Sequence, residues 1–224
     1  MLVLAFDTTA AACSVAILND GAALACLRDV MEQGQAEALM PMIERAMGAA
    51  GIAYADLDRI AVTIGPGSFT GVRVGLSAAR ALGLAAGKPV VGVSSLTVLA
   101  AAVPPEERER HATILAAIDT KRGDLYVQRF ESRGGAPLSD PAAVPAAQIA
   151  SWGCEANMLV VGDGTPAVLK ALSGASPSAA GPLPDAAVLA RLAEHREVEA
   201  GGPLPLYVLA PKITLAPHGG RLRP

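Results

Sequence analysis

The feature that most constrains the fold is a pattern that occurs twice in the chain. Residues 4–8 and residues 117–120 each form an aliphatic run that ends in Asp-Thr. In both places a valine, Val15 or Val127, follows the aspartate by eight positions inside a second aliphatic run. A strand, an acidic turn and a strand therefore open two units, which predicts a duplicated, two-lobed fold. The alternative is coincidence, because this local arrangement is common.

The first half of the chain alternates short aliphatic runs with segments of helical periodicity. Asn19-Asp20-Gly21 is a strong turn signal between two such runs, so the first three strands are expected to be antiparallel neighbours. Helices are expected where apolar residues recur with helical spacing and a glycine or proline follows. The expected strands cover 2–6, 13–18, 22–27, 60–64 and 90–93, and the expected helices 35–50, 70–86 and 95–102.

The second half is richer in Ala, Pro, Gly and Ser and predicts less regular structure. Residues 104–110 are expected to be a linker, and the segments 132–145 and 174–184 loops. Strands are expected at 113–118, 125–130 and 158–161, with helices after the turn 162–165 and at 184–195. The prediction is an α/β protein of two lobes, 1–103 and a smaller 111–214, with a mobile tail at 215–224.

The predicted helix 70–86 carries small residues at every fourth position: Gly67, Gly71, Gly75, Ala79, Gly83 and Gly87. Positions four apart lie on one face of a helix, so these residues form a groove that another backbone can approach closely. Glycine inside a helix costs about 0.5–1 kcal/mol relative to alanine, which implies a compensating contact. The contact is either a second chain or the helix's own sheet.

Methionines gather on the first predicted helix, and methionine suits adaptable contact surfaces. Met42 departs from the apolar stripe of its helix, which suggests a second apolar face, although packing in the core explains methionines as well. The two helices together predict a partner interface composed of Leu39, Met40, Met42, Ile43, Met47, Gly71, Arg73, Gly75, Ala79 and Gly83.

Motifs for several common chemistries fail the spacing test. After Gly65 and Gly67 the third glycine of a dinucleotide fingerprint comes one residue late, at Gly71. Ser68 lacks the flanking glycines of a nucleophile elbow. The three histidines are scattered and form no helical metal pair. We therefore expect neither a catalytic residue nor a metal ligand.

The two Asp-Thr turns are the candidates for a nucleotide cleft. In two-lobed folds of the actin, sugar-kinase and heat-shock ATPase kind, such turns face each other, hold phosphates and manage magnesium. The alternatives are a working kinase or ATPase, a degenerate cleft, which we favour, and aspartates that only cap turns. The residues of this predicted vestigial cleft are Asp7, Thr8, Thr9, Asp119, Lys121, Gly123, Gly162, Asp163 and Gly164.

Composition limits the class of protein. Hydrophobic residues make up 52% of the 224 residues and charged residues only 17%, which favours a large buried partner surface. A net charge of −3 gives no basic footprint for autonomous binding to nucleic acid. The three cysteines form no C-x-x-C pair and cannot all pair within one chain, which fits a reducing cytosol. Without a basic leader or an apolar run of about 20 residues, we expect a soluble, cytoplasmic protein and no membrane contact.

Several blocks of the sequence resemble the TsaB family, and they occur in the family's order. The most specific is Gly-Pro-Gly-Ser-Phe-Thr-Gly-Val-Arg at 65–73. The others are 7–9 with 12–16, then 92–96, and finally 117–119 with Gly123 and Tyr126. The resemblance extends from Met1 to about Pro211. The catalytic paralogue TsaD shares the fold but carries a histidine pair for metal that this chain lacks.

The resemblance implies a two-lobed actin-like fold (ASKHA, ribonuclease H-like) and the role of a non-catalytic scaffold. TsaB-like proteins pair with TsaD through the helices of the first lobe, and the ATPase TsaE joins them. The product is threonylcarbamoyladenosine at position 37 of tRNA. In such a complex, the partner subunits use ATP and magnesium, and this chain contacts tRNA only indirectly. A chain of this family can also form a homodimer when TsaD is absent. No peptidase activity is implied.

Two positions depart from the family pattern. Gln35 stands where the family often has histidine, and Leu209 replaces the arginine of a Pro-x-Tyr-x-Arg segment near the C-terminus. The second departure puts in doubt any polar contact that this arginine makes, but not the fold.

Overall fold

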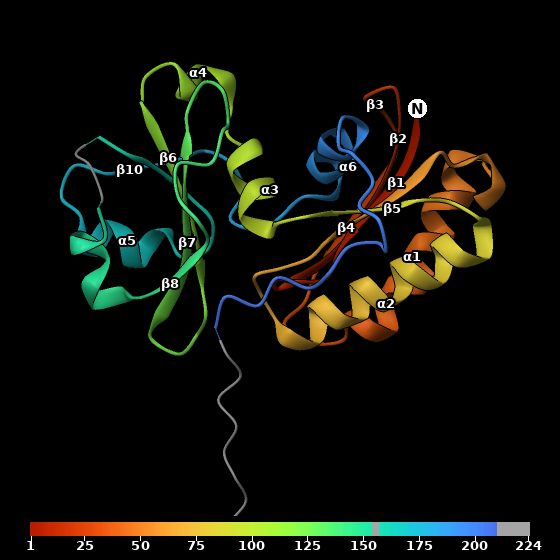
Figure 1. The fold of residues 1–224 in the computed structure, drawn as a ribbon, viewed down its shortest axis with the longest axis horizontal. Helices are drawn as coiled ribbons and strands as arrows, with labels where there is room; N and C mark the ends of the chain where they lie inside the picture. Colours follow the sequence, from red (N-terminus) through yellow and green to blue (C-terminus); the bar gives the residue numbers. More distant parts are fainter. Residues whose placement is uncertain (154–156, 210–224) are drawn as a thin grey trace, which may run out of the picture.

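The computed structural model describes residues 1–153 and 157–209, which form two lobes around two five-stranded sheets (Figure 1). The first sheet contains β1 (Leu2–Asp7), β2 (Ala12–Asn19), β3 (Ala22–Val30), β4 (Arg59–Thr63) and β5 (Val90–Val93), in the order β3-β2-β1-β4-β5. The pairs β1–β2 and β2–β3 are antiparallel, whereas β4 and β5 run parallel to β1.

The second sheet repeats this topology. It contains β6 (Thr113–Asp119), β7 (Asp124–Glu131), β8 (Ala142–Pro145), β9 (Leu159–Val161) and β10 (Ser176–Pro177), in the order β10-β9-β6-β7-β8. Again the two hairpin pairs are antiparallel and the next two strands are parallel to the central one. Asp7 and Asp119 end the central strand of each sheet, so the two Asp-Thr segments do occupy equivalent positions.

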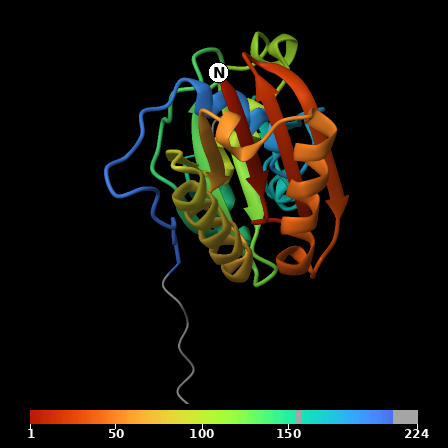
Figure 2. The same cartoon turned by 90° about the vertical axis from the view of Figure 1, so that its right-hand side faces the viewer.

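Strand β1 is buried on both faces, which explains its unbroken aliphatic sequence. Leu4 and Phe6 point to one side, where α1 (Gln35–Ala50) and α2 (Phe69–Ala86) cover the sheet. Val3 and Ala5 point to the other side, where α6 (Ala186–Glu194) packs. Figure 2 shows α1 and α2 in front of the first sheet and α6 behind it. This lobe is therefore a three-layered α/β unit.

Two helices cross between the lobes. Helix α3 (Ser95–Ala101) follows β5 in the chain, yet its Leu96 and Leu99 join the core of the second sheet, while Val98 joins that of the first. Helix α6 follows the second sheet but packs on the first (Figure 1). The predicted ranges 1–103 and 111–214 therefore do not describe the packing at these helices, and the tail predicted at 215–224 lies outside the described residues.

The second lobe is smaller. Its parallel strands β9 and β10 have three and two residues, against five and four in β4 and β5. Helix α5 (Thr165–Ala171) and the 3-10 helix η2 (Ala146–Ser151) cover one face, and α3 covers the other. Two further short helices, η1 (Tyr54–Asp56) and α4 (Pro105–Arg108), lie in connections. Among the residues that are described, no helix is long and apolar enough to cross a bilayer.

Strands β8 and β10 are corrections to the sequence prediction, which assigned their segments to loops. Both are edge strands, and both contain a proline, Pro145 or Pro177. Proline donates no hydrogen bond and is tolerated at sheet edges, where it breaks the usual sequence signal of a strand.

Candidate functional site

The β1–β2 turn of the predicted cleft is closed. Asp7 and Thr8 are fully buried, and Thr9 is 3% exposed. The Asp7 Oδ1 atom accepts hydrogen bonds from the hydroxyl groups of Thr63 and Thr9 and from the Thr9 backbone N–H, at 2.5, 2.6 and 3.2 Å. All these partners belong to the first lobe, so the carboxyl group is part of that lobe's interior.

Burial raises the pKa of Asp7, and the hydrogen bonds from Thr63 and Thr9 oppose the rise without cancelling it. The second carboxyl oxygen, Oδ2, is buried and has no hydrogen-bond partner within the described part of the chain. Burial thus makes the ionised carboxylate, the form that binds a magnesium ion, less favourable here than in an exposed aspartate. The environment of Asp7 therefore differs from that of an exposed, metal-binding carboxylate.

The N-terminus of α2 covers this turn. Ser68 donates its backbone N–H to the Thr9 carbonyl at 2.7 Å, and the Thr8 hydroxyl donates to the Gly71 carbonyl at 2.7 Å. A Cβ atom on Gly71 would stand 1.9 Å from the Thr8 carbonyl oxygen. The Thr8 hydroxyl, a donor that a phosphate could otherwise use, is thus paired with α2 instead, and the carbonyl groups of Thr8 and Thr9 lie against the same helix.

The second turn forms a charge cluster of its own. The Lys121 ammonium lies 3.1 Å from Asp119 Oδ2 and 3.4 Å from Asp163 Oδ2. Asp163 also accepts the Asp119 backbone N–H at 2.8 Å. Partial burial raises the pKa of Asp119 and lowers that of Lys121, but their mutual contacts outweigh it. The contacts with Lys121 lower the pKa of Asp119, and the contacts with both carboxylates raise the pKa of Lys121. The positive charge of Lys121 is therefore already balanced by the carboxylates of Asp119 and Asp163.

The predicted glycines of the cleft have packing roles. A Cβ atom on Gly162 would stand 2.1 Å from the Ala117 carbonyl oxygen, and one on Gly164 would be 3.0 Å from the same atom. Gly162 also has φ of 109°, which favours glycine. Gly123 is a turn residue with φ of 90° and open space around it. The turn 162–164 thus presses on the end of β6.

Two open hollows, of about 630 and 480 Å³, lie away from the predicted cleft, beside α4 at the far end of the second lobe. They are lined by Pro105, Arg108, Glu109, Arg110, His111, Ala112, Glu131, Arg133 and Asn157. None of the residues predicted for the nucleotide cleft contributes to either hollow.

The predicted partner interface needs a correction, because most of its residues lie in the core. The buried ones are Leu39, Met42, Ile43, Met47, Gly71, Gly75, Ala79 and Gly83. A Cβ atom on Gly75 would meet Thr8 and Val62 of the helix's own sheet. The small-residue stripe therefore lets α2 approach its own lobe, which was the alternative explanation. Met42 likewise packs in the core and marks no second apolar face.

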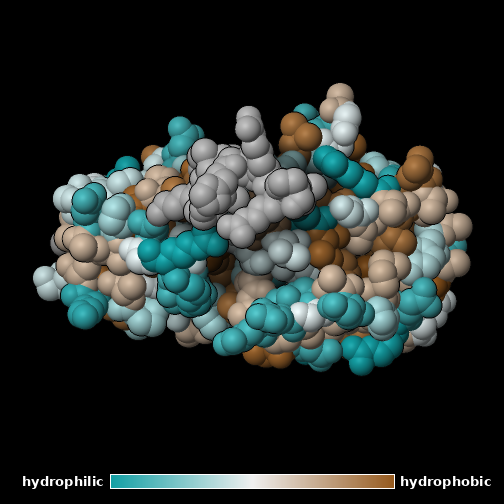
Figure 3. Space-filling view, turned by 90° about the horizontal axis from the view of Figure 1, so that it is seen from below, coloured by the Kyte–Doolittle hydropathy of each residue, from teal (hydrophilic) through white to brown (hydrophobic). Residues whose placement is uncertain are grey.

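Only Met40 and Arg73 of the predicted interface are exposed. The outer surface of the two helices carries other apolar residues that the pattern of small residues missed. On α2, Phe69 is 48% exposed and Leu84 87%. In residues 200–209, here called the C-terminal segment, Leu204 and Tyr207 are 69% and 44% exposed. Figure 3 shows brown residues interspersed with teal ones on this side of the molecule. For Phe69 and Leu84 the signal in the sequence is a position on α2 opposite the glycines.

Comparison with known proteins places the chain. Residues 29–162 match the family model described as TsaD, tRNA N6-adenosine threonylcarbamoyltransferase. The tRNA threonylcarbamoyladenosine biosynthesis protein TsaB of Escherichia coli is 37% identical over 132 residues, which are 58% of this chain and 55% of that protein. The TsaB protein of Haemophilus influenzae is 35% identical over 56% of this chain and 52% of its own length. The match thus spans about half of each curated relative.

A solved structure agrees over nearly the full length. The YeaZ protein from Pseudomonas aeruginosa superposes with a TM-score of 0.77 at 32% identity, covering 92% of this chain and 99% of the YeaZ chain. Another solved Pseudomonas aeruginosa protein, described as similar to peptidase YeaZ, has a TM-score of 0.78 at 32% identity over 93% and 99% of the two chains. The predicted two-lobed α/β fold is confirmed. The chain belongs to the TsaD family of tRNA N6-adenosine threonylcarbamoyltransferases and, within it, to the TsaB (YeaZ-like) proteins.

Proposed function

We propose that this chain is a non-catalytic subunit that pairs with a TsaD-like subunit in the threonylcarbamoylation of adenosine 37 of tRNA. The observation that carries the proposal is the closure of the β1–β2 turn. Asp7 and Thr8 have no exposed surface, and the Thr8 hydroxyl, which could donate to a phosphate in an open cleft, is paired with the Gly71 carbonyl of α2. A subunit with this turn acts by binding other chains.

In this proposal the chain uses no cofactor of its own. ATP and magnesium serve the TsaD-like subunit and a TsaE-like ATPase, and the chain meets tRNA through the complex in the cytoplasm. The net charge of −3 supports an indirect role in RNA binding, because phosphate recognition needs a basic surface.

The contact surface we propose is the exposed side of α1 and α2 with the neighbouring C-terminal segment. It contains Met40, Phe69, Arg73, Leu84 and Tyr207, all of which face solvent in the isolated chain. Large exposed apolar side chains that gather on one face are typical of a protein interface. When the TsaD-like subunit is absent, the same surface is available for a homodimer.

An omission experiment tests the proposal. The chain, the TsaD-like and TsaE-like subunits and the enzyme that supplies threonylcarbamoyl-adenylate are purified from the same bacterium and mixed with unmodified tRNA. Mass spectrometry of the digested tRNA then measures threonylcarbamoyladenosine. We expect the nucleoside with the full mixture and almost none when the chain is left out. Equal modification without the chain, or modification by the chain alone, would overturn the proposal.

A further inference from the structure

We propose that Arg73 is a receptor for a carboxylate of the partner protein, held in position by Phe69 and Tyr207. This inference rests on the proposed function and names the chemistry of its contact surface. It assigns the partner an acidic side chain at the point where α2 begins, and it gives the C-terminal segment a role in binding.

The guanidinium group of Arg73 is fixed from two sides. Its Cζ atom lies 3.7 Å from the centroid of the Phe69 ring, a distance suited to a cation–π contact. Its Nε–H donates to the Tyr207 hydroxyl oxygen at 3.3 Å, and the two aromatic rings are 5.5 Å apart. Because the side chain is already ordered, binding an anion costs it little further conformational entropy.

The rest of the guanidinium group is available. Arg73 is exposed and, within residues 1–153 and 157–209, forms no ion pair and no hydrogen bond from its terminal nitrogens. Arginine binds a carboxylate through two parallel N–H groups, which gives both strength and direction. The free edge of Arg73 offers such a pair of donors to a group that approaches from solvent.

Tyr207 is itself held by the C-terminal segment. Leu206 donates its backbone N–H to the Ile64 carbonyl at 2.8 Å, which attaches the segment to the end of β4. Arg80, two turns further along α2, donates to the Pro203 carbonyl at 2.7 Å. These two bonds fix the segment beside α2 just before Tyr207. The tyrosine therefore acts as a positioning residue for Arg73.

The charges on α2 have one sign. The helix contains Arg73 and Arg80 and no aspartate or glutamate. The described part of the chain after Glu199, residues 200–209, contains no charged residue. The chain as a whole is acidic, so this basic region is local. A complementary partner surface carries carboxylates, and like charges would repel.

Three observations favour a protein carboxylate over other anions. The Phe69 ring already bears the Arg73 guanidinium on one face, which competes with stacking of a nucleotide base. Leu84 and Leu204 are 87% and 69% exposed and offer apolar contact area that a phosphate backbone cannot use. A two-fold dimer of this chain would bring the basic region against its own copy, so self-association is expected to be weaker than pairing with an acidic partner.

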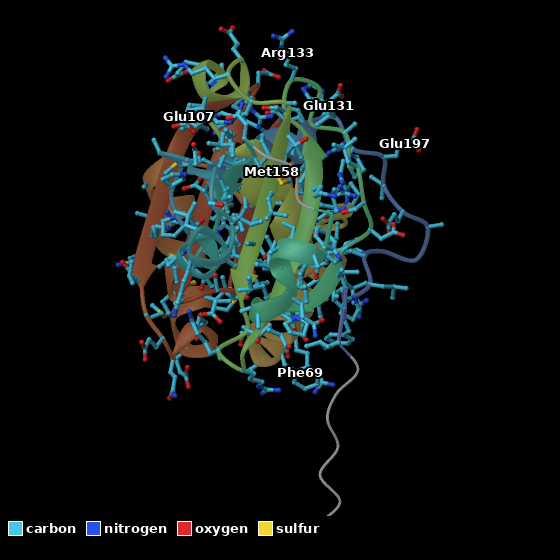
Figure 4. All side chains as sticks on the ribbon, turned by 90° about the vertical axis from the view of Figure 1, so that its left-hand side faces the viewer. Phe69, Glu107, Glu131, Arg133, Met158 and Glu197 are labelled. Carbon is cyan, nitrogen blue, oxygen red and sulfur yellow. The ribbon has the colours of Figure 1, made fainter. Side chains whose placement is uncertain are left out.

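The test compares charge reversal at two arginines. Arg73→Glu is set against Arg133→Glu, which changes the net charge equally on an exposed residue at the opposite end of the molecule from Phe69 (Figure 4). Calorimetry measures the Kd for the purified TsaD-like subunit at low and high NaCl, with thermal melting as the control for folding. We expect Arg73→Glu to weaken pairing at least about tenfold and to remove most of its salt dependence. Arg133→Glu should match wild type.

Tyr207→Phe separates positioning from direct contact. It keeps the ring and removes the hydroxyl that accepts from Arg73, so we expect a smaller loss of affinity with the salt dependence retained. If Arg73→Glu pairs as wild type does, the inference is wrong while the proposed function stands. Loss of tRNA binding or of self-association with unchanged pairing would also overturn it. If the wild-type chain does not bind the TsaD-like subunit at all, the proposed function fails and the inference fails with it.

Discussion

At Gly71 the absence of a side chain lets the first turn of α2 lie on the Thr8 carbonyl group. A Cβ atom there would be 1.9 Å from that oxygen, whereas a Cβ atom on Gly48 of α1 would meet nothing within 4 Å. Glycine is therefore required by a close contact in α2 but not in α1. Burial of Asp7 is the second decisive local feature, because the closed turn keeps its carboxyl group away from water.

We expect Gly71→Ala to destabilise the protein by about 3 kcal/mol, since backbone must move to admit the methyl group. Gly48→Ala is the matched control and should stabilise by about 0.5–1 kcal/mol, because alanine favours the helix and finds open space. Urea unfolding measures both free energies. Equal effects of the two substitutions would contradict the close contact between α2 and the β1–β2 turn.

The pH dependence of stability tests Asp7. With its pKa raised above the ordinary value of 3.8, the folded chain binds this proton more tightly than the unfolded chain does. Asp7 therefore lowers the free energy of unfolding as the pH rises from that value to the folded-state pKa. Asp7→Asn does not ionise, so it should gain stability relative to wild type between about pH 4 and about pH 7. Urea unfolding at the two pH values measures the free energy of unfolding of both proteins. If it changes equally for wild type and Asp7→Asn, the pKa of Asp7 is not raised.

At the scale of elements, α2 shows what the sequence could predict and what it could not. Spacing located the helix to within one residue and identified Gly71, Gly75 and Gly83 as a packing stripe. Spacing could not tell which backbone the stripe contacts, because close packing on the helix's own sheet and close packing on a second chain both require small residues. The exposed side follows from the answer: once the stripe faces inward, Phe69 and Leu84 must face outward.

The two lobes differ in predictability for a physical reason. Central strands such as β1 and β6 are buried on both faces and leave unbroken aliphatic runs in the sequence. The edge strands β8 and β10 are short and contain proline, so their sequences look like loops. The predicted cleft residues lie in turns that follow β1, β6 and β9, but the closure of the first turn depends on tertiary contacts such as that of Ser68 with Thr9, which the sequence pattern does not contain.

The exposed side of α2 gives a prediction at this scale. Leu84→Asp places a charge on an 87% exposed side chain and should change the free energy of unfolding by less than about 0.5 kcal/mol. It should weaken pairing with the TsaD-like subunit at least about tenfold. Leu138→Asp, on a 51% exposed leucine of the second lobe, is the control. The proposed surface is wrong if both variants bind the partner equally well in analytical ultracentrifugation.

At the scale of the whole molecule, the exchange of α3 and α6 ties the lobes together. Each helix packs on the sheet of the other lobe, and α3 contributes to the cores of both. The hydroxyl groups of Thr9 and Ser95, 3.0 Å apart, join the β1–β2 turn to the start of α3. A lobe that moved freely to admit a nucleotide would have to break these contacts. These contacts are consistent with the scaffold role proposed above.

Under the proposed function, Asp7 and Asp119 take no part in chemistry. Its direct test is the threonylcarbamoyladenosine content of tRNA in cells whose own copy of the gene is replaced by one encoding Asp7→Asn together with Asp119→Asn. Immunoblotting and thermal melting establish that the variant is present and folded. We expect modification equal to wild type. Loss of the nucleoside despite a folded variant that still binds the TsaD-like subunit would contradict it.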